Sequence, residues 1–487
     1  MITMKHSSVQ YCPVPVALPI VFVPGIMGSR LRTKHDGQIV WDPQDNILNA
    51  VTIAFKGAKA KRDLLVNNEG LPYSPDYLEV DFGEAQSSHS MHQEQIERGW
   101  GGLMQGSYFN FITWLQLIAP HPASGQLPRG CFSLRYEVWA SPYNWTDDNL
   151  NSAKGLAETV TKAIEGTEEK YQGTDVRVLK PIIITHSMGG LVSRAYTQLL
   201  GGEGKVHGVI HGAQPCDGAP DAYKRMLAGA EGNARFVLGA NQAQVTATAG
   251  NMPGALQLLP NQWHKTVSGD TQWLKVTKQK VTEQGEVADE PLLSRPITNP
   301  YSEIYLNQSD WWRLIYAEYL NPESDNSRAS FDAYKNVLNQ AATFHAQLGS
   351  EVFHPNTRML YSDDMDHASW DNVEWKQVQG SDDYTYRNNW SKGGFLETTG
   401  RGQIGISNVE NPLLHGSDSY PEYLAIYEIQ PANAPGDGTV HAGSGIHVSG
   451  PMSIPTQHGF EHQPCFDSTE VRRITAEWLL DMVQEQL

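Results

Sequence analysis

Cysteines and long hydrophobic runs are scarce in this sequence. The four cysteines, at positions 12, 131, 216 and 465 of 487, lie far apart and form no CxxC pair. This spacing argues against a disulfide scaffold and against a zinc site. No run of 18 or more apolar residues is present, so no transmembrane helix is predicted. The first twelve residues lack the apolar segment of a secretory signal peptide, so we expect cytoplasmic synthesis without Sec export.

Positive charge is scarce as well. The chain has 36 lysines and arginines against 54 aspartates and glutamates, a net charge of −18. Nucleic-acid binding requires a basic surface, so we expect no nucleic-acid partner. The same charge disfavours purely electrostatic docking on anionic lipid. A lipid substrate reached through an apolar opening, with transient contact to a membrane surface, stays compatible with it.

Short apolar runs alternate with amphipathic helical patterns along the chain. Strands that alternate with helices predict an α/β fold, with a mainly parallel sheet and helices on both faces. Helices are expected at residues 151–169, at residues 189–200 and after Asp467, where Glu470 would complete a capping pair. The predicted buried strands are Leu18–Val23, Ser133–Ala140, Val178–Thr185, Val206–His211 and Tyr423–Ile429.

Two stretches do not fit a minimal sheet. Residues 42–100 are polar and glycine-rich, and residues 213–420 separate two predicted core strands. A structureless loop of the second length is improbable in a compact domain. We therefore expect an α/β core of residues 13–212 and 421–487, with a polar insertion at 42–100, and a large cap formed by residues 213–420.

The segment from Pro181 to Val192 carries the strongest chemical signal. An apolar strand runs through a turn of small residues directly into a helix. A serine at such a turn, here Ser187, is held in a strained conformation with its hydroxyl exposed. Thr185 stands where the common G-x-S-x-G pattern has glycine. Ser187 is the predicted nucleophile, and the alternative is a serine that merely caps an ordinary helix.

A nucleophilic serine needs a base that is oriented by a carboxylate. On an α/β sheet of this kind the acid and then the base follow the serine in the chain. Asp437 lies between two glycines after the last predicted strand, so its carboxylate is free to turn inward and it is the predicted acid. His462, 25 residues later and close to the last helix, is the predicted base, with His458, His447 and His441 as alternatives.

Four motifs, in this order, resemble those of lecithin:cholesterol acyltransferase-like lipases. The resemblance implies an α/β-hydrolase fold, a lipid acyl ester as substrate, Ser187 as nucleophile and Asp437 as acid. It also implies an oxyanion hole formed by the amides of Ile26 and Met188. Asn144, in place of the more usual aspartate, and His441, in place of proline, depart from the pattern. The motifs are Pro24–Leu31 with the later Trp41-Asp42-Pro43, Ser141–Trp145, Thr185–Gly190 and Gly436–Val440.

A narrower resemblance concerns bacterial type VI secretion lipase effectors. It implies delivery into a target cell by that secretion system, with a secretion carrier and an immunity protein as partners. The segments that carry it are Gly212–Pro215, Pro253–Pro260 and Gly459–Gln463.

The expected activity is hydrolysis of a carboxylic ester of a lipid through an acyl-enzyme, as in a phospholipase A or lipase. This chemistry needs no metal and no organic cofactor. A lipid acyltransferase, a triacylglycerol lipase and a small-ester esterase are the alternatives, and a non-catalytic lipid-binding protein is one of another class. The carboxylates of Asp363–Asp366 are more typical of a solvated loop than of a cation site. The aromatic residues around Trp311 and Trp312 are expected in the core of the cap, on a helix face, and the cap is expected to have an aromatic lining.

Overall fold

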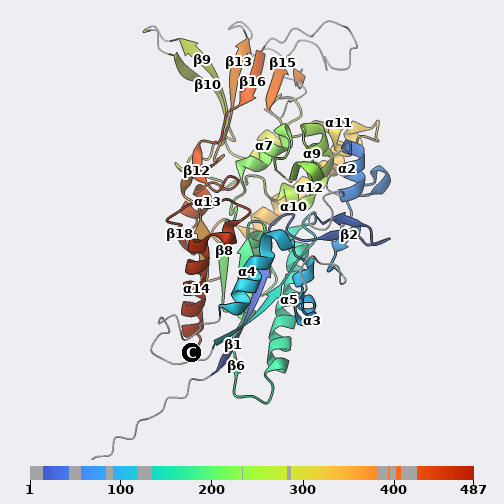
Figure 1. The fold of residues 1–487 in the computed structure, drawn as a ribbon. Helices are drawn as coiled ribbons and strands as arrows, with labels where there is room; N and C mark the ends of the chain where they lie inside the picture. Colours follow the sequence, from blue (N-terminus) through green and yellow to red (C-terminus); the bar gives the residue numbers. More distant parts are fainter. Residues whose placement is uncertain are drawn as a thin grey trace, which may run out of the picture.

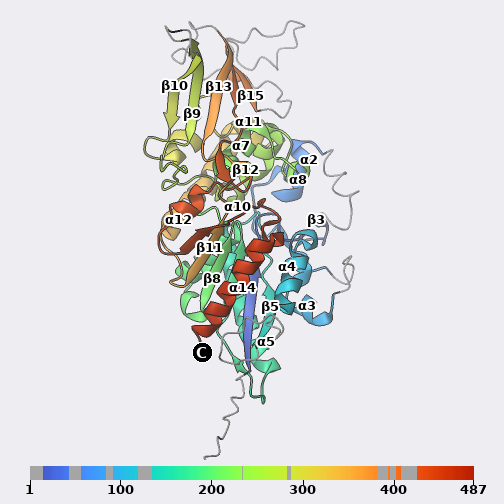
Figure 2. The same ribbon diagram turned by 60° about the vertical axis from the view of Figure 1, so that its left-hand side comes forward.

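The structure is a computed structural model of the chain, shown in Figures 1 and 2. It describes residues 15–42, 56–83, 91–118, 134–232, 234–281, 284, 287–380, 393–394, 402–406 and 425–487. Cys12 and Cys131 lie outside these ranges, and so does Pro43 of the Trp41-Asp42-Pro43 segment.

The main sheet has seven strands in the order β18, β11, β8, β7, β1 and β5, with the short β6 beside β1. All strand pairs described in this sheet are parallel, and the predicted α/β-hydrolase fold is confirmed. Strand β1, between β7 and β5, is buried along its whole length, as a continuous apolar run predicts. The strands are β1 Val16–Val23, β5 Leu134–Ala140, β6 Arg177–Val178, β7 Ile182–His186, β8 Gly208–Gly212, β11 Thr357–Tyr361 and β18 Met452–Pro455.

Helices cover both faces of this sheet (Figure 1). Ile20 and Phe22 of β1 pack with α4 and α14 on one face, and Val21 packs with α5 and α6 on the other. Alternate side chains of a strand point to opposite faces, so β1 contributes to two hydrophobic cores. The helices are α4 Gln105–Leu117, α5 Asn149–Lys170, α6 Gly189–Arg194 and α14 Thr469–Gln484.

Two strands lie in other places than the sequence predicts. The run at Tyr423–Ile429, expected in the main sheet, forms β16 (Ala425–Ile429) of a second sheet, where its partners are antiparallel. Conversely, β11 joins the main sheet from inside the predicted 213–420 insertion. A buried apolar run looks alike in either sheet, so periodicity alone does not assign it. The boundaries of core and cap otherwise stay a prediction.

The second sheet lies at one end of the molecule, and short helices of the cap lie between it and the main sheet (Figures 1 and 2). Its order is β10, β9, β13, β16, β15 and β14. Its strands are β9 Leu274–Val281, β10 Val287–Arg295, β13 Val373–Gly380, β14 Gly393–Gly394, β15 Gln403–Ile406 and β16. The intervening helices are α7 Pro220–Ala228, α8 Ala234–Val237, α9 Gln242–Thr248, α10 Pro253–Leu256, α11 Ala317–Leu320 and α12 Ser327–Leu348.

Smaller elements complete the described fold. A three-stranded sheet and two helices come from or near the predicted insertion at 42–100, and a two-stranded sheet follows β11. These elements are β2 Leu31–Thr33, β3 Ile39–Trp41, β4 Leu78–Val80, α2 Ala58–Leu65, α3 Gln93–Glu97, β12 Asp364–Ser369, β17 Ala434–Gly436 and α13 Gly443–Ile446.

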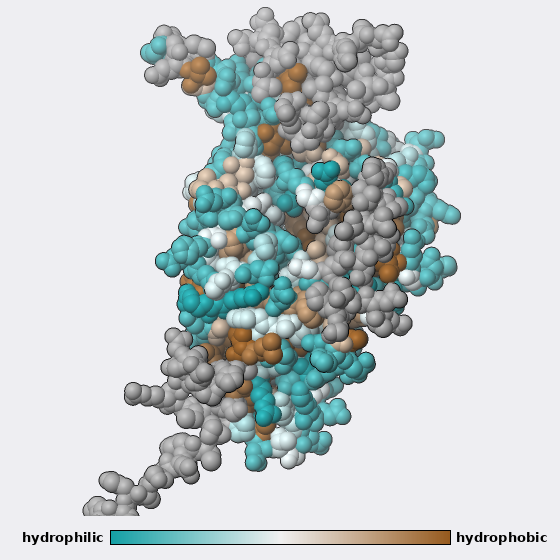
Figure 3. All heavy atoms as spheres, viewed as in Figure 1, coloured by the Kyte–Doolittle hydropathy of each residue, from teal (hydrophilic) through white to brown (hydrophobic). Residues whose placement is uncertain are grey.

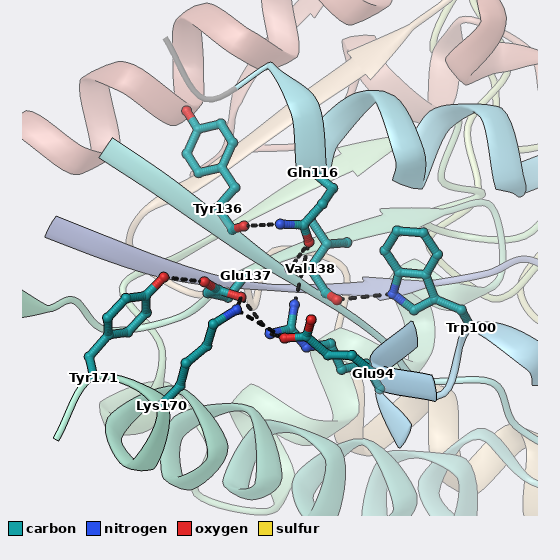
Figure 4. Close-up of polar contacts among 9 residues, drawn as sticks. Glu94, Trp100, Gln116, Tyr136, Glu137, Val138, Lys170 and Tyr171 are labelled. Atoms are coloured by element: carbon teal, nitrogen blue, oxygen red, sulfur yellow. Dashed lines mark hydrogen bonds and ion pairs between the residues drawn. The ribbon is translucent and has the colours of Figure 1, made fainter. Parts of the chain in front are cut away.

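Side chains protect the exposed edge of β5 (Figure 4). The Gln116 amide of α4 donates to the Tyr136 carbonyl at 2.6 Å and accepts from the Val138 amide at 3.1 Å, as a neighbouring strand would. The Trp100 indole donates to the Val138 carbonyl at 2.9 Å. Buried Glu137 binds Lys170, Tyr171 and the Arg98 guanidinium. The bonded groups at Tyr136 and Val138 are therefore not free to pair with a strand of another chain.

We expect Gln116→Leu to lower the free energy of unfolding by about 2 kcal/mol, because it leaves a carbonyl and an amide of β5 without partners. Urea denaturation would measure this effect. Gln340→Leu, on an exposed position of α12, is the control and should change the free energy by less than about 0.5 kcal/mol. Equal effects of the two substitutions would contradict the role assigned to Gln116.

The surface in Figure 3 is mainly hydrophilic, with hydrophobic residues in small separate groups. Within the described ranges, no helix is long and apolar enough to cross a membrane.

Candidate active site

Ser187 lies at the sharp turn between β7 and α6. Its φ angle is +51°, a left-handed conformation that costs about 1–3 kcal/mol for a residue with a side chain and is concentrated at functional sites. A Cβ atom at Gly189 would lie 2.5 Å from the Pro24 carbonyl oxygen and 2.6 Å from that of Val23. Only glycine therefore lets α6 start so close to β1, and the turn has the geometry expected of a nucleophile.

The three predicted side chains form one hydrogen-bonded chain. The Ser187 Oγ lies 2.9 Å from His462 Nε2. The His462 Nδ1 lies 2.8 Å from Asp437 Oδ2. The predicted alternatives lie elsewhere: His458 is exposed, and His447 Nε2 contacts the Thr266 carbonyl. His462 is thus the histidine that the fold brings to the serine.

Backbone amides hold the Asp437 carboxylate in place. Its Oδ1 accepts from the amides of Thr439 at 3.0 Å and Val440 at 2.7 Å, while Oδ2 is left for His462. The Asp437 carbonyl also accepts from the His462 amide at 2.7 Å. Asp437 follows β17, which pairs with β12, and not the strand from which the sequence predicted it to emerge.

Glu470 supports the loop that carries His462. Its carboxylate accepts from the Gln457 amide at 2.7 Å and the His458 amide at 2.8 Å. The capping pair predicted at Asp467 and Glu470 is therefore wrong. Ser468 is the N-cap of α14, because its short side chain reaches the first free amides of the helix, and this releases Glu470 for the loop.

His186, directly before the serine, links the site to α4. The Tyr108 hydroxyl accepts from the Gly25 amide at 3.2 Å and lies 2.8 Å from His186 Nδ1. It donates to Nδ1, because the neutral imidazole carries its proton on Nε2. His186 Nε2 then donates to the His462 carbonyl at 2.7 Å. Burial and the neighbouring His462 lower the pKa of His186 to about 3. His186 is thus a neutral side chain that contacts the backbone of His462. The sequence places it in the Thr185–Gly190 motif, as a wall of the turn and not as a second base, whereas no pattern in the sequence marked Tyr108.

Thr185 replaces the usual glycine because the neighbouring strand offers it a partner. Thr185 of β7 is paired with His211 of β8, and its hydroxyl lies 2.7 Å from His211 Nδ1. Both residues are buried, so each polar group needs the other. Burial and the nearby Arg194 lower the pKa of His211 to about 3.

This pair makes the stability of the protein depend on pH. The unfolded His211 takes up a proton below pH 6.5, whereas the folded one stays neutral down to about pH 3. The contribution of neutral His211 to the free energy of unfolding is therefore complete above pH 6.5. Below that pH it falls by about 1.4 kcal/mol per pH unit. We expect His211→Gln to destabilise the fold at pH 7.5 and this difference to shrink by about 2 kcal/mol at pH 5. Urea denaturation at both pH values measures the stability difference between the wild type and His211→Gln. A difference that does not change with pH would contradict the neutral state of buried His211.

The two amides predicted to bind an oxyanion flank the serine. Met188 is the N-cap of α6, and the loop at Ile26 lies against the serine, since a Cβ atom at Gly25 would lie 3.0 Å from the Ser187 Cβ. Among the described residues, neither amide donates a hydrogen bond to another backbone group. Both are thus available to a negative oxygen near Ser187 Oγ.

The residues of the lipase-like motifs contact one another in this fold. The Trp41 indole donates to the Met27 carbonyl at 2.8 Å. The Tyr143 hydroxyl donates to the Pro24 carbonyl at 3.0 Å. These two contacts hold the loop that carries the Ile26 amide. The Asn144 side chain donates to the Leu78 carbonyl and accepts from the Thr146 amide and hydroxyl, and a carboxylate could not make the first of these bonds.

A cavity of about 640 Å³ opens beside Ser187 and His462, within the usual size range of ligand pockets. Its apolar wall comes mainly from α7 to α10 and the turns between them. Among the described residues this part of the wall is aliphatic, so the expected aromatic lining of the cap is wrong: Trp311 and Trp312 are buried in a hydrophobic core outside any helix and do not line the cavity. The aromatic side chain of Trp41 lines the cavity from β3. The wall is formed by Ala222, Met226, Ala230, Ala234, Leu238, Val245, Ala249, Ala255, Leu256, Leu258 and Leu259.

The carboxylates of Asp363–Asp366 do not converge on one point. Asp364 Oδ2 lies 2.9 Å from His367 Nδ1, and Asp364 Oδ1 accepts from the Asp366 amide. Within the described part of the chain, no three His, Cys, Asp or Glu side chains are grouped as metal ligands.

One solved structure matches almost the whole chain. A chain of the Tle4–Tli4 complex aligns with 97% of this chain and 100% of its own length, at 26% identity and a TM-score of 0.71. Tle4 is a type VI lipase effector. The chain resembles a type VI lipase effector. The resemblance to lipases and to these effectors that the motifs indicated is therefore confirmed.

Two further solved structures align with part of the chain at low TM-scores. The mature lipase BlEst2 of Bacillus licheniformis aligns with 57% of this chain and 71% of its own, at 15% identity and a TM-score of 0.20. Phospholipase PlaB of Legionella pneumophila aligns with 60% of this chain and 65% of its own, at 12% identity and a TM-score of 0.19. No family model and no curated protein matches the sequence.

Proposed function

We propose that the protein is a serine hydrolase that cleaves acyl esters of lipids, as a phospholipase A does. The observation that supports it most is the hydrogen-bonded chain from Ser187 through His462 to Asp437 beside an apolar cavity. An aliphatic cavity of this size suits an acyl chain better than a small polar ester. The resemblance to a type VI lipase effector points to the same reaction class.

The reaction follows from the geometry. Ser187 Oγ attacks the ester carbonyl while His462 Nε2 takes its proton. Asp437 Oδ2 accepts the Nδ1–H bond, which fixes the tautomer and stabilises the imidazolium. The amides of Ile26 and Met188 bind the oxyanion. His462 then protonates the leaving alcohol, and a water that it activates releases the fatty acid from Ser187.

Vesicles of mixed phospholipids, with products read by mass spectrometry, test this proposal. The wild type should release fatty acid and lysophospholipid, and Ser187→Ala should release neither. An added acceptor alcohol separates hydrolysis from acyl transfer, because transfer would yield a new ester. Turnover of triacylglycerols or short esters, with phospholipids left intact, would refute the phospholipase assignment.

We further propose that the protein is an antibacterial effector with an immunity protein as partner. The support is the resemblance to a type VI effector whose solved structure contains Tli4. Expression in the bacterial periplasm should arrest growth with the wild type and not with Ser187→Ala. Equal growth of both strains, with the wild type active on extracted lipid, would contradict this role.

A further inference from the structure

We propose that Arg225 binds the phosphate of the lipid headgroup and that the surrounding acidic rim selects zwitterionic over anionic phospholipid. The inference rests on the proposed hydrolysis of lipid esters and names the headgroup that this site prefers. Arg225, Asp366 and Glu461 line the same cavity as Ser187 and His462. We call Arg225, Asp366 and Glu461 the rim of the cavity. A lipid with its ester at Ser187 and an acyl chain against the aliphatic wall would place its headgroup at this rim.

The guanidinium of Arg225 is held by two neighbouring side chains and keeps N–H groups for a ligand. Its Nε forms an ion pair with Asp221 Oδ2 at 2.8 Å, and its Nη2 donates to Thr439 Oγ1 at 3.2 Å. Among the described residues the hydrogen bond to Thr439 is the one that the guanidinium makes, because its Nε is buried and forms an ion pair but no hydrogen bond with Asp221. The other three N–H groups, on Nη1 and Nη2, are available to a ligand. Its side chain is 31% exposed, whereas that of Asp221 is 1% exposed. A guanidinium fixed from behind and open in front suits two oxygens of a phosphate.

Thr439 ties this guanidinium to the reacting groups. Thr439 is two residues after Asp437, whose carboxylate orients His462. The Thr439 amide donates to Asp437 Oδ1 at 3.0 Å. The phosphate position and the ester position are therefore set by one short loop. Such a link places the acyl ester relative to the headgroup, because both ends of the glycerol are held by connected residues.

The rest of the rim is negative. Asp366 and Glu461 are exposed and form no ion pair within the described part of the chain, while the charge of Arg225 is balanced by Asp221. A headgroup that carries an ammonium next to its phosphate is attracted to this arrangement. A headgroup with phosphate alone meets uncompensated carboxylates and is disfavoured.

Binding to protein in the Ser187→Ala background tests the inference without turnover. Isothermal titration with short-chain phosphatidylethanolamine, phosphatidylglycerol and diacylglycerol of the same acyl length gives three affinities. We expect Arg225→Gln to weaken phosphatidylethanolamine binding about tenfold or more, as loss of a charge-assisted contact does. Diacylglycerol binding should fall far less, and Arg225→Lys should recover part of the loss.

The controls separate a headgroup contact from a structural role. Arg235→Gln removes an exposed arginine outside the cavity and should change no affinity. Asp366→Asn with Glu461→Gln should raise phosphatidylglycerol affinity relative to phosphatidylethanolamine. Equal loss for all three lipids with Arg225→Gln, or no loss, would overturn the inference. A wild type that hydrolyses no ester would instead overturn the proposed reaction, and the affinities would still decide on Arg225.

Discussion

Ser187→Ala should lower kcat/KM on a soluble acyl ester by about 10⁴–10⁶-fold, the loss seen when a nucleophile is removed from a triad. The reason is that His462 Nε2 lies 2.9 Å from Ser187 Oγ and no covalent intermediate forms without that oxygen. The fold should persist, because alanine removes one polar atom and keeps the packing. Steady-state kinetics and thermal unfolding measure the two effects separately.

Ser193→Ala is the matched control for this substitution. Ser193 lies on the same helix α6, and its buried Oγ has no hydrogen-bond partner in the described structure. Its removal should leave kcat/KM within about threefold of the wild type. Residual turnover of Ser187→Ala near the wild-type rate would mean that another group attacks the ester.

Asp437→Asn should lower kcat by about 10⁴-fold while the fold stays intact. The amides of Thr439 and Val440 hold the side-chain oxygen at Oδ1. The amide group of asparagine therefore faces His462 Nδ1, which must accept a hydrogen bond. The proton of the neutral imidazole then sits on Nε2, so His462 cannot take the proton of Ser187. Kinetics over a pH series, with circular dichroism as a check of folding, measure the loss.

The second Asp–His pair of this region provides the comparison. Asp364 lies 2.9 Å from His367, and Asp364→Asn makes the same chemical change outside the proposed triad. We expect it to lower kcat by less than about tenfold. Similar losses for Asp437→Asn and Asp364→Asn would show that the effect is a general one on the loops and not on the tautomer of His462.

The effector interpretation and the lipase chemistry make separate demands on the protein. The chemistry depends on the hydrogen-bonded chain from Ser187 through His462 to Asp437. The effector role depends on delivery and on a partner protein, for which the resemblance at 26% identity is the support. Activity on lipid in vitro and growth arrest in the periplasm are therefore independent tests.

The sequence by itself determined the turns that carry the predicted catalytic residues. Ser187 and Asp437 lie in short segments whose local pattern, a strand into a turn of small residues or an aspartate between glycines, reflects a backbone requirement that only a few residue types satisfy. His462 was predicted from its order in the chain, and three other histidines stayed open until the fold was known. Gly189 is the clearest example, since a side chain there would collide with the carbonyls of Val23 and Pro24. Such requirements are local, and a single sequence displays them.

Only the tertiary structure decided which distant residues support those turns. Thr185 meets His211 across two strands, and His186 meets Tyr108 from α4, through contacts that no local spacing encodes. The assignment of β16 to the second sheet failed from sequence for a related reason. A strand is apolar because it is buried, and burial against the cap or against the main core leaves the same pattern. Arg225 likewise gained its place at the rim from the packing of α7 on the loop of Asp437.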